Sequence, residues 1–321
     1  MLNRTRALLA SVLVLVAGVL SACAPPGAEP DAEPDAATSA GTPGRPLVLA
    51  TFTVLADMAQ VVGGEHVQVE SLTKAGAEIH SYEPTPSDVR KAADADLILA
   101  NGLNLESWLG QFLQDSDAPA VTVTEGIEPI SITEGEGAGH PNPHAWMSPL
   151  AAQTYVDNIA AALSQLDPAH AADYLANAAA YKLELATLHA ELVDSLVHLP
   201  NHQRLLVTCE GAFSYLAADA GLGEAYLWAV NSDGETGARR MMELSDRVRT
   251  SGVPAVFCES TVPARTMEQI ATDTGVRYAG ALYVDSLSAA GGPVPTYLDL
   301  IRHDTALIAE ALSAETAPEE E

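Results

Sequence analysis

Apolar and polar residues follow two different spacings along most of the chain. Short apolar runs such as "LVLA" (47–50) and "DLILANG" (96–102) have the length and composition of buried strands. Between such runs, apolar residues recur at helical spacing, as in the tract that ends at Gly63-Gly64 and in "LESWLGQFLQD" (105–115). Strands that alternate with helices are typical of βα units and predict mainly parallel sheets.

One helical tract is much longer than the others. From Pro168 to Pro200 the chain is rich in Ala, Leu, Glu and Lys, and it begins at a proline suited to a first helical turn. A helix of this length would extend about 45 Å, which is too long for one small lobe. We therefore expect a rigid helix that joins two lobes.

The same alternation of strands and helices resumes after this tract. The predicted fold class is α/β, with two lobes that each contain a mainly parallel four-stranded sheet flanked by helices. The predicted segments are an N-terminal lobe (46–165), a linking helix (166–200), a C-terminal lobe (201–316) and an acidic tail (317–321). In open parallel sheets, ligands bind beyond the carboxyl ends of the strands. Two facing lobes would place that region in a cleft between them.

The N-terminus has the features of an export signal. Arg4 and Arg6 precede an apolar run from Leu8 to Leu20, and the small residues of "LSAC" follow and end at Cys23. A membrane-spanning helix needs about 20 apolar residues, and this run is shorter. The site resembles the cleavage site of bacterial lipoproteins, which implies a signal peptide (1–22) and a lipid chain on Cys23.

The next segment differs sharply in composition from the rest of the chain. Residues 23–45 contain Ala, Pro, Gly, Asp and Glu and no large apolar side chain after the cysteine. Such a segment cannot bury a core, so we predict a disordered tether. The tether would hold the folded part away from the outer face of the cytoplasmic membrane.

The charge of the chain narrows its range of partners. With 43 acidic and 15 basic residues, the formal net charge is −28. Because nucleic acids attract Lys and Arg, this balance argues against a nucleic-acid partner. It weakly favours a cationic ligand.

Four residues that can bind a metal lie at predicted strand ends or next to a helix start. His80 follows an apolar stretch, His144 stands just before a helix, and Glu210 and Asp285 end two apolar runs. Each residue alone is more often a surface histidine, a helix cap or part of a salt bridge. Together, two histidines and two carboxylates from four distant segments would form a complete ligand shell for a divalent cation.

Several motifs containing these residues resemble those of a known family. They are "HSYEPTPSD", "NGLNLESWL", "NPHAWMSP", "TCEGAFSYLA", "FCESTVPARTMEQIATDTG" and "LYVDSLS". They are similar to the metal-binding lipoproteins of bacterial ABC importers for manganese, zinc and iron, and their order in the family is kept. The resemblance implies two α/β lobes, a long linking helix and a metal between the lobes. It also places His80, His144, Glu210 and Asp285 at the family's ligand positions.

The residue at the third of the four ligand positions, Glu210, bears on which metal is bound. Family members with histidine there tend to bind zinc, often with a His-rich loop, whereas this chain has Glu210 and a loop with only His140. An anionic oxygen hardens the site and favours Mn²⁺, with Fe²⁺ and Zn²⁺ as alternatives. His140 and His144 have helical spacing, but the prolines between them exclude a helix.

Two positions depart from the family pattern. Asn142 replaces the usual acidic residue, so we expect weaker support of the ligand beside it. Cys209 replaces a small hydroxyl residue. Because neighbouring strand residues face opposite sides, Cys209 should point into the core if Glu210 faces the cleft. Cys209 and Cys258 could then form a disulfide or remain two buried thiols.

We interpret the chain as a binding protein rather than an enzyme. Its expected partners are a divalent metal ion, an ABC permease with its ATPase, and the membrane through the lipid on Cys23, and we expect a monomer. A metallohydrolase is the weaker alternative, because four protein ligands could fill the coordination shell, no unassigned general base is apparent, and the chain has no HExxH or GxSxG motif. A second role as a surface adhesin stays open.

Overall fold

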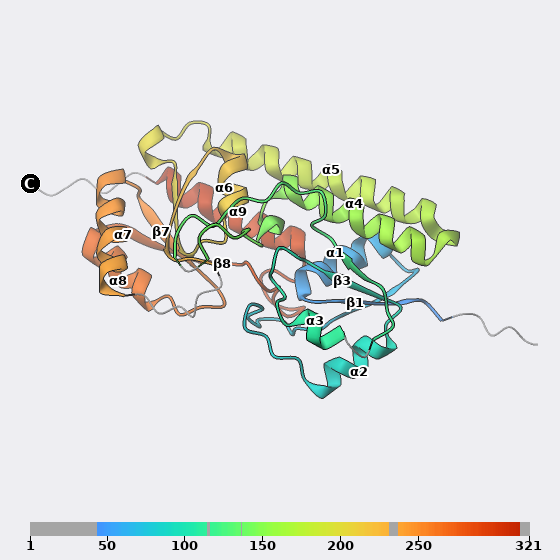
Figure 1. Cartoon of the computed structure of the whole chain (residues 1–321). Helices are drawn as coiled ribbons and strands as arrows, with labels where there is room; N and C mark the ends of the chain where they lie inside the picture. The colour runs from blue at the N-terminus through green and yellow to red at the C-terminus, as the bar shows by residue number, and fades with distance from the viewer. Residues whose placement is uncertain (1–43, 114–115, 136, 231–236, 315–321) are drawn as a thin grey trace, which may run out of the picture. The chain divides into compact units, whose positions relative to one another are not determined.

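The first lobe is built on a four-stranded parallel sheet with the order β2-β1-β3-β4 (Figure 1). Its strands are β1 (Leu47–Ala50), β2 (Gln68–Ser71), β3 (Leu97–Ala100) and β4 (Ala120–Thr122). The structure is a computed structural model that describes residues 44–113, 116–135, 137–230 and 237–314. The parallel sheet predicted for this lobe is confirmed.

Both central strands of this sheet are covered on two faces. Val48 and Leu99 belong to one apolar cluster, whereas their neighbours Leu49 and Ile98 belong to another on the opposite face. This explains the uninterrupted apolar runs, since a strand buried on both sides has no polar face. The helices of this lobe are α1 (Thr53–Gly63), α2 (Pro86–Asp94), α3 (Leu109–Phe112) and α4 (Pro149–Leu166).

Helix α3 is much shorter than the helix predicted over 105–115. It spans only Leu109–Phe112. Leu103 and Asn104 have φ angles of 52° and 66°, in the left-handed region. These two residues precede the predicted range, and residues 105–108 continue as a turn, held by the Glu106 carboxylate, which accepts the backbone N–H groups of Asn101 and Gly102. Residues 114–115 of the predicted range lie outside the described residues.

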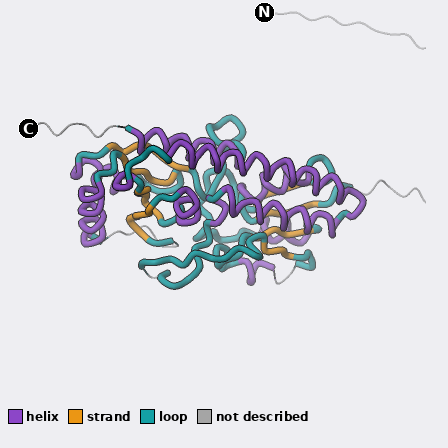
Figure 2. Tube along the Cα trace, turned by 90° about the horizontal axis from the view of Figure 1, so that it is seen from above, coloured by secondary structure: helices purple, strands orange, loops and turns teal. Residues whose placement is uncertain are grey.

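Helix α5 (Ala171–Leu196) runs beside α4 and is the predicted linking helix (Figures 1 and 2). Its 26 residues extend about 39 Å. The prediction placed its start at Pro168, but Pro168–His170 form a separate 3₁₀ turn. One face of α5 is buried at intervals of three and four residues, by Tyr174, Ala178, Tyr181, Leu185, Leu188, Leu192 and Leu196.

This buried face lies in an apolar core shared by both lobes. The same cluster contains Leu99 of β3, Tyr181 of α5, Leu206 of β5 (Leu205–Glu210) and Ile308 of α9 (Tyr297–Ser313). Separating the lobes would expose much of this surface, at about 25 cal/mol per Å² of apolar area. The helix is therefore a packed joint, as the sequence predicted.

The second lobe differs in detail from the predicted four-stranded sheet. Its hydrogen-bonded strands form two parallel pairs, β5 with β6 (Gly223–Trp228) and β7 (Ala255–Glu259) with β8 (Arg277–Leu282). Strand β5 packs beside β7, but at their border the Glu210 N–H donates to the Glu259 side chain. The helices are α6 (Ser214–Ala220), α7 (Ala238–Ser251), α8 (Arg265–Thr274) and α9.

A disulfide joins β5 to β7. Cys209 and Cys258 are bonded, their Cα atoms lie 4.8 Å apart, and both side chains are fully buried. This Cα separation is the ordinary spacing of neighbouring strands. Of the two alternatives left open by the sequence, the structure contains the disulfide.

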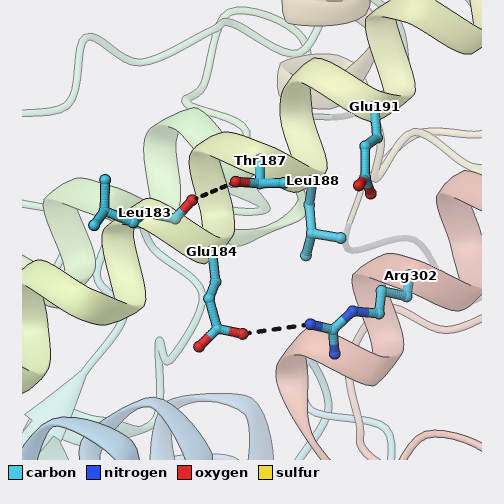
Figure 3. Close-up of a pocket in the computed structure, with 6 residues that line it drawn as sticks. All are labelled: Leu183, Glu184, Thr187, Leu188, Glu191 and Arg302. Atoms are coloured by element: carbon cyan, nitrogen blue, oxygen red, sulfur yellow. Dashed lines mark hydrogen bonds and ion pairs between the residues drawn. The ribbon is translucent and has the colours of Figure 1, made fainter.

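Helices α5 and α9 also meet at the surface. Figure 3 shows Arg302 of α9 reaching toward Glu184 of α5, with 3.4 Å between Nη2 and Oε2. The two side chains border a crevice of about 300 Å³, which is also lined by Leu183, Thr187, Leu188 and Glu191. None of the four candidate metal ligands borders this crevice.

Several predicted segments lie outside the described residues. They are the signal peptide, Cys23, almost all of the tether and the acidic tail. Among the residues that the structure describes, no helix has the length and apolarity needed to cross a membrane. The lobe boundaries given above stay predictions.

The disulfide predicts a measurable stabilisation. Its cysteines are 49 residues apart, and closing a loop of that size in the unfolded chain is worth about 4 kcal/mol. The double variant Cys209→Ala/Cys258→Ala should therefore unfold in urea with a free energy lower by about 4 kcal/mol. Two titratable thiols in wild-type protein, denatured without reductant, would contradict the bond itself.

Candidate metal centre

The structure brings all four sequence-predicted residues together. His80 lies in the loop after β2 (the His80 loop, 72–85), and His144 immediately precedes a 3₁₀ turn (Ala145–Met147). Glu210 is the last residue of β5, and Asp285 lies in the loop after β8 (the Asp285 loop, 283–296). Three of the four residues thus follow the carboxyl end of a parallel strand, where ligand sites of such sheets form.

The donor atoms of these residues converge on one point. The His80 Nε2 lies 3.1 Å from the His144 Nε2 and 3.4 Å from the Glu210 Oε1. The Asp285 Oδ1 lies 3.6 Å from the His144 Nε2 and 3.9 Å from the His80 Nε2. Two ligand atoms on a tetrahedral ion, each bonded at about 2.1 Å, are about 3.4 Å apart. The spacing therefore fits a single divalent ion.

The surroundings of one carboxylate oxygen of Asp285 support this fit to a divalent ion. Its Oδ1 is buried and has no hydrogen-bond partner among the described residues. A buried carboxylate oxygen without a donor is costly unless a cation or a proton satisfies it. Together with the two histidine nitrogens, this oxygen belongs to a group of atoms that lie within 4.8 Å of one another.

The site is closed on most sides. His144, Glu210 and Asp285 are 0%, 4% and 1% exposed. The His80 side chain is 10% exposed and is the most accessible of the four. A bound ion would therefore lie beneath His80, and the other three residues would form the enclosed part of the site.

Burial also sets the protonation of two ligands. It lowers the pKa of His144 to about 3, so this imidazole is neutral near pH 7 and keeps a lone pair for a metal. Burial raises the pKa of Asp285 to about 6, while the neighbouring His80 acts in the opposite direction. Asp285 is thus mostly ionised at neutral pH, as a metal ligand must be.

Asn142 determines which nitrogen of His144 faces the site. The Asn142 Oδ1 accepts the His144 backbone N–H at 3.1 Å and lies 3.0 Å from the ring Nδ1. The Asn142 Nδ2 donates to the Gly211 carbonyl at 2.7 Å. These backbone partners fix the orientation of the amide, so the oxygen faces the ring. The ring Nδ1 therefore carries the proton, and the Nε2 lone pair points to the site.

The weaker support expected of Asn142 relative to an acidic residue stays a prediction, but the structure gives the amide a second partner. A carboxylate at this position could accept from His144 but could not donate to the Gly211 carbonyl. The amide does both, and it thereby connects His144 of the first lobe to the residue after Glu210 in the second. The sequence did not show this, because the partners are far apart along the chain.

Glu259 also contacts the site and was not among the predicted residues. Its Oε2 accepts the Glu210 backbone N–H at 3.1 Å, and burial raises its pKa to about 8. The sequence held one signal, because Cys209-Glu210 and Cys258-Glu259 repeat the same pair at two strand ends. Glu259 and the two cysteines also form a compact group, but a disulfide leaves no thiolate for a metal.

Comparisons with known proteins identify relatives of the chain. Residues 48–311 match the family described as "Zinc-uptake complex component A periplasmic" (ZnuA). The chain is 48% identical over 264 residues to the iron-binding protein YfeA of Yersinia pestis, covering 82% of this chain and 85% of YfeA. It is 31% identical over 282 residues to the metal ABC transporter substrate-binding lipoprotein FimA of Streptococcus parasanguinis, with coverages of 85% and 91%.

A solved structure is similar over nearly its whole length. It is the Mn-bound periplasmic metal-binding protein of Candidatus Liberibacter asiaticus, with a TM-score of 0.78 and 38% identity. The similarity covers 83% of this chain and 99% of that protein. The two-lobed α/β fold predicted from the sequence is therefore confirmed.

The role of Asn142 can be tested in the metal-free protein. In wild-type protein, the nitrogen chemical shifts of His144 should show the Nδ1–H tautomer. Asn142→Ala should give a mixture of tautomers and lower the Zn²⁺ affinity by about 10–100-fold, because the ring loses the acceptor that orients it. Asn142→Asp is the matched control and should keep the tautomer. An unchanged His144 spectrum in Asn142→Ala would contradict this assignment.

Proposed function

The chain belongs to the ZnuA family of metal-binding proteins of ABC importers, and from this premise we propose how it captures its ion. It is a solute-binding protein that takes up a divalent metal ion outside the cytoplasm for import, and it is not an enzyme. The ligands in this proposal are His80, His144, Glu210 and Asp285. The observation that carries it is the set of distances of 3.1–3.9 Å among their donor atoms.

The proposed ion is Mn²⁺. Two carboxylates and two imidazoles form a harder ligand set than three imidazoles and one carboxylate, and such a set suits Mn²⁺ or Fe²⁺. Each carboxylate can also bind through two oxygens, which allows a coordination number above four. The names of the relatives include iron and manganese, and the family is named for zinc. Fe²⁺ and Zn²⁺ are therefore the alternatives.

The proposed route of the ion leads to an ABC permease, with its ATPase as an indirect partner. The description of the family as periplasmic and the names of the relatives support a location outside the cytoplasm. We propose further that the protein stays attached to the membrane by a lipid on Cys23. FimA, a relative of similar length, is called a lipoprotein.

Removing Glu210 provides the direct test of the ion site. Mn²⁺ at about 100 times its Kd should stabilise wild-type protein by about 2.7 kcal/mol. In Glu210→Ala the stabilisation by Mn²⁺ should disappear, because one anionic ligand is lost. Glu210→His is the matched variant and should keep a response to Zn²⁺ while losing most of the response to Mn²⁺. Thermal unfolding with each chloride salt measures both.

Two results of this test would contradict the proposal. An undiminished Mn²⁺ shift in Glu210→Ala would exclude Glu210 as a ligand. A wild-type protein that shifts with Zn²⁺ but not with Mn²⁺ would replace the manganese assignment with the zinc alternative.

The lipid anchor has a separate test. Cys23→Ala should move the protein from the membrane fraction to the soluble extracytoplasmic fraction, because acyl chains hold it with about 0.8 kcal/mol per buried CH₂ group. Ser39→Ala, in the same predicted tether, is the control and should leave the protein with the membrane. Fractionation and intact mass measure both variants. A wild-type protein whose intact mass shows no added acyl chain would exclude the anchor at this residue.

A further inference from the structure

The Asp285 loop is hydrogen-bonded to the first lobe on both sides of its ligand. The Val284 carbonyl accepts the indole N–H of Trp146 at 3.0 Å, and the Leu287 N–H donates to the Thr53 Oγ1 at 2.9 Å. Trp146 closely follows the ligand His144, and Thr53 opens helix α1. Asp285 therefore follows β8 in sequence but is held in position by the first lobe.

Ser286 adds a third connection, which reaches the His80 loop. Its Oγ accepts the backbone N–H of Gly76 at 2.7 Å and donates to the Leu287 carbonyl at 3.1 Å. Ser286 is 2% exposed, so water does not readily replace this bond. Gly76 has a φ of +79° in a turn of the His80 loop. One hydroxyl group thus joins the loops that contain two of the proposed ligands.

Leu287, next to Ser286, is buried in the shared apolar core, so packing also holds this part of the Asp285 loop. A surface cavity of about 290 Å³ lies beside it, bordered by Thr53, Leu287 and Ser288 among other residues. His80 is also the most exposed of the four ligands. The His80 loop is therefore the part of the site that can open first, and the hydrogen bond from Gly76 to Ser286 opposes that opening.

We propose that Ser286 is a positioning residue that holds the His80 loop against the Asp285 loop and so slows release of the bound ion. This inference rests on the proposed function and deepens it. Ser286 does not contact the ion in this proposal and acts through His80. Loss of its hydroxyl group would leave the Gly76 N–H without its acceptor and would free the His80 loop to move away from Asp285.

The experiment compares Ser286→Ala with Ser288→Ala in the full chain. Ser288 is the matched control, because its hydroxyl group accepts the Val294 N–H within the same loop. Release of Zn²⁺ into excess chelator is followed by stopped flow. Ser286→Ala should speed release by about three- to tenfold, the equivalent of one hydrogen bond, and Ser288→Ala should leave the rate unchanged.

A double-mutant cycle tests whether Ser286 acts through His80. In a His80→Ala background, Ser286→Ala should change the Zn²⁺ release rate no further, because the ligand it positions is absent. A general structural effect would instead raise the Zn²⁺ release rate by the same factor in both backgrounds. Equal release rates for wild type and Ser286→Ala, or additive effects in the cycle, would overturn the proposal.

Hydrogen exchange in the metal-free protein separates this inference from the proposed function. Ser286→Ala should speed amide exchange at residues 76–80 relative to Ser288→Ala, whether or not the chain binds an ion. Unchanged exchange at these residues would overturn the role of Ser286. A wild-type chain that binds no divalent ion would overturn the proposed function and release control together, while exchange would still report the connection between the loops.

Discussion

The constraint on which the site depends is the burial of two carboxylates beside two imidazoles. Glu210 and Asp285 are almost fully enclosed, and an ionised carboxylate in such surroundings is costly without a compensating positive charge. The two histidines cannot supply that charge in full, because burial keeps His144 neutral. A divalent cation would satisfy the four residues at once. The rest of the fold holds the four residues close together despite the free-energy cost of burying their charges.

The shared core explains how the four proposed ligands stay in place relative to one another. The buried face of α5 packs with residues of both lobes, including Leu99 and Leu206. A wide hinge motion would pull this core apart, so small movements of ligand-bearing loops are the less costly way to open the site. The cross-lobe bonds of Asn142 and Ser286 lie in those loops. The ease of opening is therefore set by a few hydrogen bonds, whereas the packing of the core sets the limits of movement.

Local patterns in the sequence predicted most of the fold. Buried strands, amphipathic helices and their terminating residues are properties of short segments, which explains why β1, β3 and α5 were found near their true limits. Helix α3 was overestimated, because the sequence did not show that the Glu106 carboxylate accepts the Asn101 and Gly102 N–H groups and so holds residues 105–108 in a turn. The division of the second sheet into two pairs was also missed, because it depends on how β5 and β7 meet, and these strands are far apart in the sequence.

In the candidate site, too, some features could be predicted from the sequence and others could not. The four candidate ligands were found because strand ends are recognisable and because the chain resembles a known family. The supporting contacts were not predicted, since Asn142, Glu259 and Ser286 are ordinary polar residues in sequence. Their roles come from partners such as Gly211 and Gly76, which only the folded chain brings near.

A different contact, between Thr261 and Asp285, bears on the choice of ion. The Thr261 hydroxyl reaches the Asp285 Oδ2 at 3.4 Å, longer than the usual 2.7–2.8 Å or so for such a bond. A weak bond is easily given up, so Asp285 can offer both oxygens to an ion that requires more than four ligands. In the proposed site, Mn²⁺ would gain from this freedom and tetrahedral Zn²⁺ would not, so the immediate surroundings of Asp285 favour the same ion as Glu210 does.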